Sequence, residues 1–361
     1  MARILTESIY GDKIDSTGKI ISFSRYGFEQ KIIGRKDCFI CGARQDGYKK
    51  FNEEHIIPDW VISKYSSPKK LVGLPNLTKY RLNQYKVPCC KECNQRMGKE
   101  IEQPVSRLFE LSHQEFFNKI TQNQDNHLLL YRWMCLIYFK IFYKDTFLKA
   151  DRSDPNSDAR IGDIYDWHNI HFIHNIARSH YSGLEIQPNV VGSTLILSAL
   201  PISLDKGGIF LTYYNNPCLK ININGICVIM MLMDAGFFDH NFFSSLFSDF
   251  NHQLSVDQLT EIMAFLIYGN TRLKENPVFW FKHSPSFRVQ AELPKAVVLN
   301  EVEKYTKEEI HYRLVEGPLR RNNPGPETEA LLDRIRREGG STLYDENGKP
   351  VDISKITRKE R

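Results

Sequence analysis

Two cysteine pairs that lie far apart in the chain constrain its fold more than any other feature. Cys38 and Cys41 form one C-x₂-C pair, and Cys90 and Cys93 form another. Four thiolates with this spacing can close a tetrahedral zinc site, which is structural because no ligand position stays open. We therefore predict a structural Zn²⁺ bound by these four cysteines, which brings residues 38–41 and 90–93 together.

The second pair leaves one alternative open. Cys89 forms a C-x₃-C pair with Cys93 and could replace Cys90 as a ligand. We favour Cys90 and interpret Cys89 as a small buried neighbour. The chain has eight cysteines, and no secretory signal follows Met1. This pattern predicts a metal site in the reducing cytoplasm rather than a disulfide framework.

Positive charge is concentrated in the region of the cysteines. The whole chain has a net charge of +5, whereas residues 1–100 contain 19 Lys and Arg against 11 Asp and Glu. A positive field of this kind attracts polyanions, of which nucleic acid is the commonest. The alternative is a solvated surface that happens to be basic.

The most apolar run, residues 128–143, contains Arg132 and Lys140 and is short for a bilayer span. We expect a buried or amphipathic helix there and no membrane partner. Apolar spacing predicts a helix over about 101–111, with Pro104 in its first turn or at a kink, and another over about 127–148. Residues 151–158 form a polar loop.

Further along, residues 190–233 contain short β-rich runs separated by turn signals at Asn215-Asn216-Pro217 and Asn224-Gly225, which predicts an antiparallel sheet. Ser255 is the expected cap of a helix that reaches about Tyr268. The predicted class is α+β. The predicted divisions are an irregular or β-like extension (1–36), a domain that contains both cysteine pairs (37–125), a C-terminal domain of unassigned function (126–300), and a helical, partly mobile tail (301–361).

A second candidate site lies between the cysteine pairs. Glu54 and His55 open the string Glu-His-Ile-Ile-Pro, and Asn94 directly follows Cys93. A carboxylate beside an imidazole can serve a metal ion and a water nucleophile. On a strand the two side chains point to opposite faces, so they need a local twist or bulge to act together. Asn94 either binds a metal or caps a helix.

Taken together, the two cysteine pairs, the Glu-His-Ile-Ile-Pro string and the Cys-Asn junction resemble the zinc-stabilised branch of the HNH endonucleases. The resemblance covers about residues 36–103 and implies that the domain over 37–125 is an HNH nuclease domain. It implies a ββα-metal fold around one catalytic divalent ion, Mg²⁺ or Mn²⁺. It further implies that His55 is the general base and that Glu54 and Asn94 are ligands of that ion. The middle Asn of the motif is Asn76 or Asn83, and we favour Asn76.

The implied activity is metal-dependent cleavage of DNA phosphodiester bonds, with RNA not excluded as a substrate. The resemblance suggests a role in bacterial restriction or phage defence, and an oligomer or activating partner bound through the C-terminal domain. Two alternatives are a non-catalytic zinc ribbon that binds nucleic acid or protein, and a zinc hydrolase of small molecules, which four cysteines disfavour. The expected phosphate contacts are basic residues around the second cysteine pair: Lys79, Arg81, Lys86, Lys91, Arg96 and Lys99.

Overall fold

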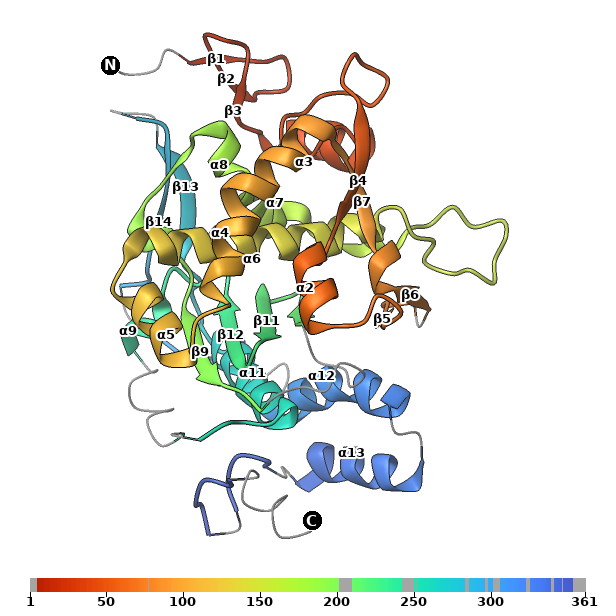
Figure 1. Cartoon of the computed structure of the whole chain (residues 1–361), viewed down its shortest axis with the longest axis vertical. Helices are drawn as coiled ribbons and strands as arrows, with labels where there is room; N and C mark the ends of the chain where they lie inside the picture. The colour runs from red at the N-terminus through yellow and green to blue at the C-terminus, as the bar shows by residue number, and fades with distance from the viewer. Residues whose placement is uncertain are drawn as a thin grey trace. The chain divides into compact units, whose positions relative to one another are not determined.

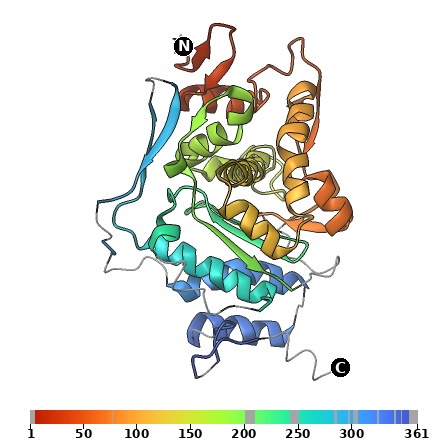
Figure 2. The same cartoon turned by 60° about the vertical axis from the view of Figure 1, so that its left-hand side comes forward.

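The computed structural model describes residues 5–76, 78–200, 210–241, 250, 252–282, 286–295, 298–300, 306–322, 325–338, 341–345 and 347–352. The chain forms two compact units (Figure 1 and Figure 2). Both combine helices and strands, which confirms the α+β class. The first unit comprises Met1–Glu110, Asn118–Val190 and Phe279–Ala291, and the second comprises Leu111–Phe117, Val191–Val278 and Glu292–Arg361.

The first unit begins with a small antiparallel sheet followed by helical turns. The elements are β1 (Leu5–Glu7), β2 (Lys13–Asp15), β3 (Ile20–Ser22), α1 (Arg25–Gly27) and the π-helical segment η1 (Phe28–Gly34). The expectation of an irregular or β-like segment is therefore wrong for residues 25–34. The Ser24 hydroxyl accepts the Gly27 N–H at 2.8 Å, and the segment buries Phe28 and Ile32. A capped turn with one apolar face is stable as a helix even when glycines flank it.

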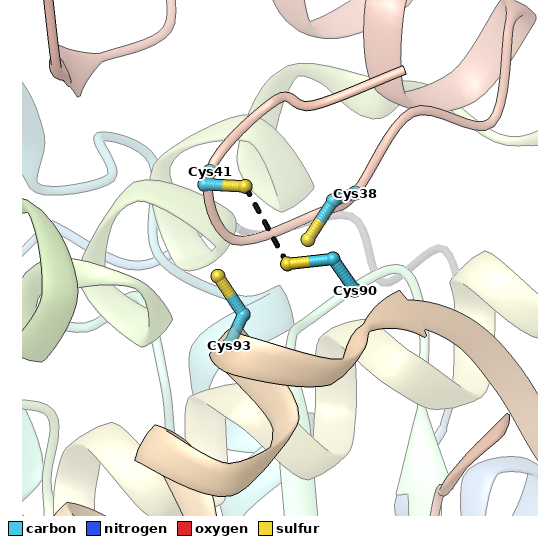
Figure 3. Close-up of side chains that lie close together, drawn as sticks. All are labelled: Cys38, Cys41, Cys90 and Cys93. Atoms are coloured by element: carbon cyan, nitrogen blue, oxygen red, sulfur yellow. Dashed lines mark hydrogen bonds between the residues drawn. The ribbon is translucent and has the colours of Figure 1, made fainter. Parts of the chain in front are cut away.

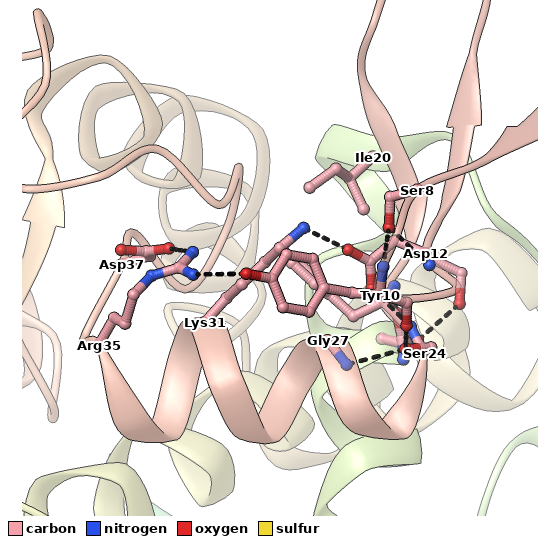
Figure 4. Close-up of polar contacts among 12 residues, drawn as sticks. Ser8, Tyr10, Asp12, Ile20, Ser24, Gly27, Lys31, Arg35 and Asp37 are labelled. Carbon is pink, nitrogen blue, oxygen red and sulfur yellow. Dashed lines mark hydrogen bonds and ion pairs between the residues drawn. The ribbon is translucent and has the colours of Figure 1, made fainter.

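A buried carboxylate joins this sheet to the helical turns (Figure 4). Asp12 is fully buried, accepts the Ser24 N–H at 3.0 Å and pairs with Lys31. A Cβ added at Gly27 would lie 1.9 Å from Oδ1 of Asp12. Only glycine therefore permits this approach of helix and carboxylate.

The cysteine-rich segment folds as strand, insertion, strand and helix. β4 (Phe51–His55) pairs with β7 (Lys86–Cys90) in an antiparallel register from Phe51 opposite Cys90 to His55 opposite Lys86. β7 leads directly into α3 (Lys91–Met97), and Pro104 lies in the first turn of a following helix, as predicted. The other elements here are α2 (Asp59–Tyr65), β5 (Leu71–Gly73), β6 (Lys79–Arg81), η2 (Leu82–Gln84), η3 (Gly98–Glu102) and α4 (Gln103–Leu108).

The long helix α6 (Gln124–Asp145) supplies much of the first unit's core. It confirms the helix expected over 127–148, and it begins earlier because the Asn123 side chain caps the Asn126 N–H. Its buried residues include Trp133, Phe139 and Tyr143, and it packs against α7. The polar loop expected at 151–158 is confirmed. The remaining elements are η4 (Ile161–Ile164), α7 (Trp167–Ala177), α8 (Ser179–Ser182), β8 (Glu185–Ile186), η5 (Pro188–Val190), β13 (Val278–Lys282) and β14 (Arg288–Glu292).

The second unit is built on the predicted antiparallel sheet, with strand order β10-β11-β12-β9. Asn224 and Gly225 both have positive φ and form the tight turn between β11 and β12. Ser255 and Gln258 form a reciprocal capping box on α11, which packs against the sheet. The elements are β9 (Thr194–Ser198), β10 (Phe210–Tyr213), β11 (Cys218–Ile223), β12 (Ile226–Met231), α9 (Phe237–Asn241) and α11 (Val256–Thr271), with α5 (His113–Thr121) crossing a unit boundary.

The tail expected to be helical contains α12 (Lys307–Asn322) and α13 (Pro326–Glu338). Residues 301–305, 323–324, 339–340, 346 and 353–361 lie outside the described part of the tail.

Candidate metal centre and the polar site beside it

The four predicted cysteine ligands lie together in the first unit (Figure 3). Their Sγ atoms are all within 4.8 Å of one another, and Sγ of Cys41 is 3.7 Å from Sγ of Cys90. In a tetrahedral site with Zn–S bonds of about 2.3 Å, neighbouring sulfurs are about 3.8 Å apart. The four cysteines could therefore hold a metal ion such as zinc.

Cys89 is a neighbour of this cluster and not one of its four members. Its Sγ lies 3.8 Å from Sγ of Cys38. Burial, reinforced by the contact with Cys38, raises the pKa of the Cys89 thiol well above its usual value. The four-sulfur cluster contains Cys90 and not Cys89, so the geometry supports the preference for Cys90.

A tight turn shapes the first cysteine pair. The Gly42 N–H donates to the Cys38 carbonyl at 2.8 Å, and Gly42 has a φ of +75°. A Cβ at this position would lie 2.9 Å from the Phe23 ring. Both the backbone conformation and the close approach require glycine, so the turn depends on this residue.

Two buried side chains of the α7 region fix the backbone of the same turn. The Arg178 guanidinium is fully buried and donates to the carbonyls of Ile40 (2.7 Å), Ile21 (3.0 Å) and Ile20 (2.6 Å). Nε2 of His174 lies 2.6 Å from the Phe39 carbonyl. The turn that presents Cys38 and Cys41 is thus bound to the core by charged and neutral hydrogen bonds.

The strand β4 places the predicted acid, Glu54, in the interior. Glu54 is 6% exposed, and its Oε1 accepts a hydrogen bond from Nζ of Lys140 at 2.7 Å. Nζ of Lys140 also donates to the His55 carbonyl at 2.6 Å and lies 3.8 Å from Oε1 of Glu102. Burial raises the pKa of Glu102 to about 7. Lys140 is therefore the cation that pairs with Glu54 and lies close to Glu102.

His55 is half-buried at the end of β4, opposite Lys86 in the register. Burial is the main cause that lowers the pKa of His55, and the charge of Lys86 lowers it further. Its imidazole is consequently neutral at pH 7 and can accept a proton. Because successive strand residues alternate, His55 and Glu54 point to opposite faces of β4.

Asn94 lies in α3 and does not cap it. The N-cap is Cys90, and Nδ2 of Asn94 donates to Oδ1 of Asn52 at 3.1 Å. Asn52 and Glu54 are two residues apart on β4, so Asn94 packs over the face of β4 that carries Glu54. The capping alternative for Asn94 is wrong.

The two candidates for the middle Asn lie elsewhere in the insertion. Asn76 is in the turn between β5 and β6, where its side chain accepts from Thr78 and donates to the Lys149 carbonyl at 2.9 Å. Asn83 is exposed in η2. The Asn76 side chain thus binds its own turn and the loop after α6, and its catalytic role stays a prediction.

The predicted phosphate contacts are distributed over several elements. Arg96 is engaged by Glu100, with Nε 2.9 Å from Oε1, and lies over the Tyr181 ring at 5.4 Å. Lys86 is half-buried, and the other members are exposed: Lys79, Arg81, Lys91, Arg96 and Lys99.

Lys140 occupies the carboxylate of Glu54 that the implied catalytic ion would need. The carboxylate of Glu54 and the amide oxygen of Asn94 are hard ligands that suit Mg²⁺ or Mn²⁺. In this structure, however, the carboxylate of Glu54 already pairs with Lys140. The donor atoms therefore fit such an ion, but the ion would have to displace the Lys140 ammonium or share the carboxylate with it.

Sequence reasoning missed Lys140 and Glu102 as site residues. The available signal was a lone lysine within an apolar helical run, because a buried ammonium requires a carboxylate partner. Which carboxylate it meets depends on the packing of α6 against β4. Arg178 was missed for the same reason, since its partners are backbone carbonyls more than a hundred residues away.

Comparisons with protein-family models, with curated proteins and with solved structures give no match for this chain. Within the part of the chain that is described, every helix is too short or too polar to cross a membrane.

Proposed function

We propose that this protein is a metal-dependent endonuclease that cleaves DNA phosphodiester bonds and is braced by a structural zinc ion. One observation carries the proposal: the antiparallel pair β4–β7 runs directly into α3, and the four-cysteine cluster joins that pair to the turn at residues 38–41. This strand–strand–helix order presents His55, Glu54 and Asn94 from neighbouring elements.

His55 is the proposed general base. Its half-buried imidazole, whose pKa is lowered by burial, is neutral at pH 7 and can take a proton from an attacking water. Because Glu54 and His55 point to opposite faces of β4, the proposal requires a twist at the end of the strand that brings the scissile phosphate within reach of both side chains. Lys86 lies opposite His55 in the register, and its ammonium would offset negative charge on the phosphoryl oxygens.

Glu54 and Asn94 are the proposed ligands of Mg²⁺ or Mn²⁺, which when bound would offset charge on the phosphate. The Glu54 carboxylate also accepts a hydrogen bond from Lys140. We infer that the divalent ion and the Lys140 ammonium compete for the Glu54 carboxylate. The exposed basic residues of β6, α3 and η3 are the proposed contacts to the DNA backbone.

The test is cleavage of plasmid DNA by zinc-loaded protein with Mg²⁺ or Mn²⁺. We expect wild-type protein to nick or cut the plasmid and His55→Ala to lose at least about a hundredfold in rate, the usual contribution of a general base. Lys274→Ala, at an exposed position outside the proposed DNA interface, is the control and should retain full activity. Equal cleavage by wild type and His55→Ala refutes the assignment.

A second candidate function is a non-catalytic zinc module that binds nucleic acid or protein. The ion pair between Glu54 and Lys140 favours it, because a carboxylate neutralised by a lysine serves the fold without any metal ion. Salt-sensitive DNA binding with no cleavage by the wild-type protein would support this candidate over the nuclease.

A further inference from the structure

A pocket in the first unit lies apart from the cysteine cluster and from His55, with which it shares no lining residue. Its volume is about 450 Å³, within the range of small-molecule sites. β2, α1, α7 and β13 contribute to its walls, together with the segment that precedes β14. The residues used below are Lys13, Arg25, Phe172, Phe281 and Phe287.

One wall of the pocket is a column of nearly parallel rings. The ring centroids of Phe172 and Phe281 are 5.3 Å apart with an interplanar angle of 15°, and those of Phe281 and Phe287 are 5.6 Å apart at 10°. All three side chains are only half-buried. Such a column offers a planar ring both apolar area and favourable stacking geometry.

The polar part of the pocket contains two cationic side chains, Lys13 and Arg25, and none of its described lining residues is acidic. Both cations have carboxylate partners outside the lining: Lys13 pairs with Glu7, and Arg25 pairs with Glu29 at 2.9 Å and Asp166 at 3.5 Å. The Arg25 side chain is 52% exposed and also lies 3.2 Å from Nδ1 of His168. Exposed ion pairs of this kind contribute little, so an anion can recruit the guanidinium without a large loss. Two cationic side chains together suit a dianion better than a single carboxylate.

We propose that this pocket binds a nucleoside phosphate, with the base against the Phe172–Phe281–Phe287 column and the phosphate at Arg25 and Lys13. The base of such a ligand suits the aromatic wall of the pocket, and its phosphate suits the two cationic side chains. This site is independent of the proposed nuclease chemistry, because neither His55 nor the cysteines take part in it.

The test is calorimetric titration of the full-length, zinc-loaded protein with adenosine 5′-monophosphate. Adenosine and ribose 5-phosphate are the half-ligand controls, and we expect both to bind at least about tenfold more weakly. A short single-stranded oligonucleotide distinguishes a free nucleotide from a nucleic-acid end: the proposal expects the mononucleotide to bind at least as tightly as the oligonucleotide.

Variants locate the site. Arg25→Gln should weaken binding about tenfold, the value of a charged hydrogen bond. Phe281→Leu should weaken it roughly two- to tenfold, because it removes the middle ring of the column while keeping apolar bulk. Arg44→Gln and Tyr48→Leu are the matched controls: Arg44 also pairs with an exposed aspartate, and Tyr48 is 91% exposed. Both controls should bind as wild type does. If Arg25→Gln folds poorly, Lys13→Gln is a second variant that should bind adenosine 5′-monophosphate more weakly than wild type.

His55→Ala should retain full binding of adenosine 5′-monophosphate whether or not the nuclease proposal holds. The proposal is overturned if wild type shows no saturable binding at about 1 mM, or if Arg25→Gln and Phe281→Leu bind as wild type does. Loss of binding in His55→Ala alone would move the ligand to the other site and would equally overturn it.

Discussion

At the residue scale, Lys140 decides how the polar site is charged. Its ammonium is fully buried in α6 and contacts Glu54, the His55 carbonyl and Glu102. A buried ion is tolerated only when its partners offset the loss of hydration. Lys140 therefore ties β4 to α6 and at the same time fills the role that a metal cation would have at Glu54.

Lys140→Gln should destabilise the protein by about 3–5 kcal/mol, because Glu54 and Glu102 stay buried without a cation. Urea unfolding measures the loss. The double variant Glu54→Gln/Lys140→Gln is the matched control and should lose less than the sum of the two single variants. Additive losses would mean that the two side chains are not coupled.

The same variant tests the competition between lysine and metal ion. Mn²⁺ should raise the melting temperature of Lys140→Gln more than that of wild type, because the ion then meets a free carboxylate. Thermal unfolding of zinc-loaded protein with and without Mn²⁺ provides the measurement. Equal shifts in both proteins would contradict competition at Glu54.

Burial of His171 makes the stability of the protein depend on pH. Burial lowers the pKa of His171 to about 4, from about 6.5 in the unfolded chain. The unfolded state therefore binds the proton first, and stability falls as the pH drops from about 6.5 towards 4. From pH 7 to pH 5 this residue accounts for about 2 kcal/mol of lost stability.

The variant His171→Gln lacks this contribution to the pH dependence. Urea unfolding at both pH values should therefore show that its free energy of unfolding falls less between pH 7 and pH 5 than that of wild type. Parallel pH profiles would contradict the assignment.

At the element scale, β11 carries a charge in an otherwise apolar position. All six residues of the strand are buried, and Nζ of Lys220 donates to the Thr260 hydroxyl of α11 at 2.5 Å. Burial lowers the pKa of Lys220 to about 8, so the side chain is still charged at pH 7. The ammonium thus has a hydroxyl partner, but its burial removes its hydration shell, which destabilises the folded state.

Lys220→Met should stabilise the protein at pH 7 by about 1–3 kcal/mol, because an apolar side chain of similar length replaces the buried ion. Thr260 keeps its hydrogen bond to the Val256 carbonyl. The gain should shrink as the pH rises from 8 towards 10.5, where wild type becomes neutral in both states. Urea unfolding at pH 7 and pH 10 measures it, and Lys274→Met at an exposed position is the control. A loss of stability at pH 7 would show that the ammonium contributes more than its burial costs.

At the scale of the whole molecule, the two compact units depend on different interactions. The first contains the four-cysteine cluster, and the second contains a sheet covered by α11 with a continuous apolar core. Structural zinc sites contribute directly to folding free energy. Loss of the ion should therefore destabilise the first unit more than the second.

Removal of zinc by a chelator should increase amide hydrogen exchange in residues 38–97 and leave β11 and β12 protected. Mass-spectrometric exchange of peptides measures both regions in one experiment. Cys90→Ser should show the same pattern and contain no zinc by elemental analysis, whereas Cys89→Ser should retain about one ion per chain. Equal deprotection of both units, or zinc loss in Cys89→Ser alone, would contradict the assigned ligand set.

The amino-acid sequence by itself determined the features that local chemistry encodes. The C-x₂-C spacing identified the four cysteines that cluster, the Ser255 cap and the Asn224-Gly225 turn placed their elements, and alternation on β4 separated Glu54 from His55. Tertiary structure decided the partners of the buried charges: Lys140 meets a carboxylate 86 residues away, and Arg178 meets carbonyls 138 or more residues away. The physical reason is that spacing and turn residues act within a few positions, whereas a buried ion is satisfied by whatever packing brings to it.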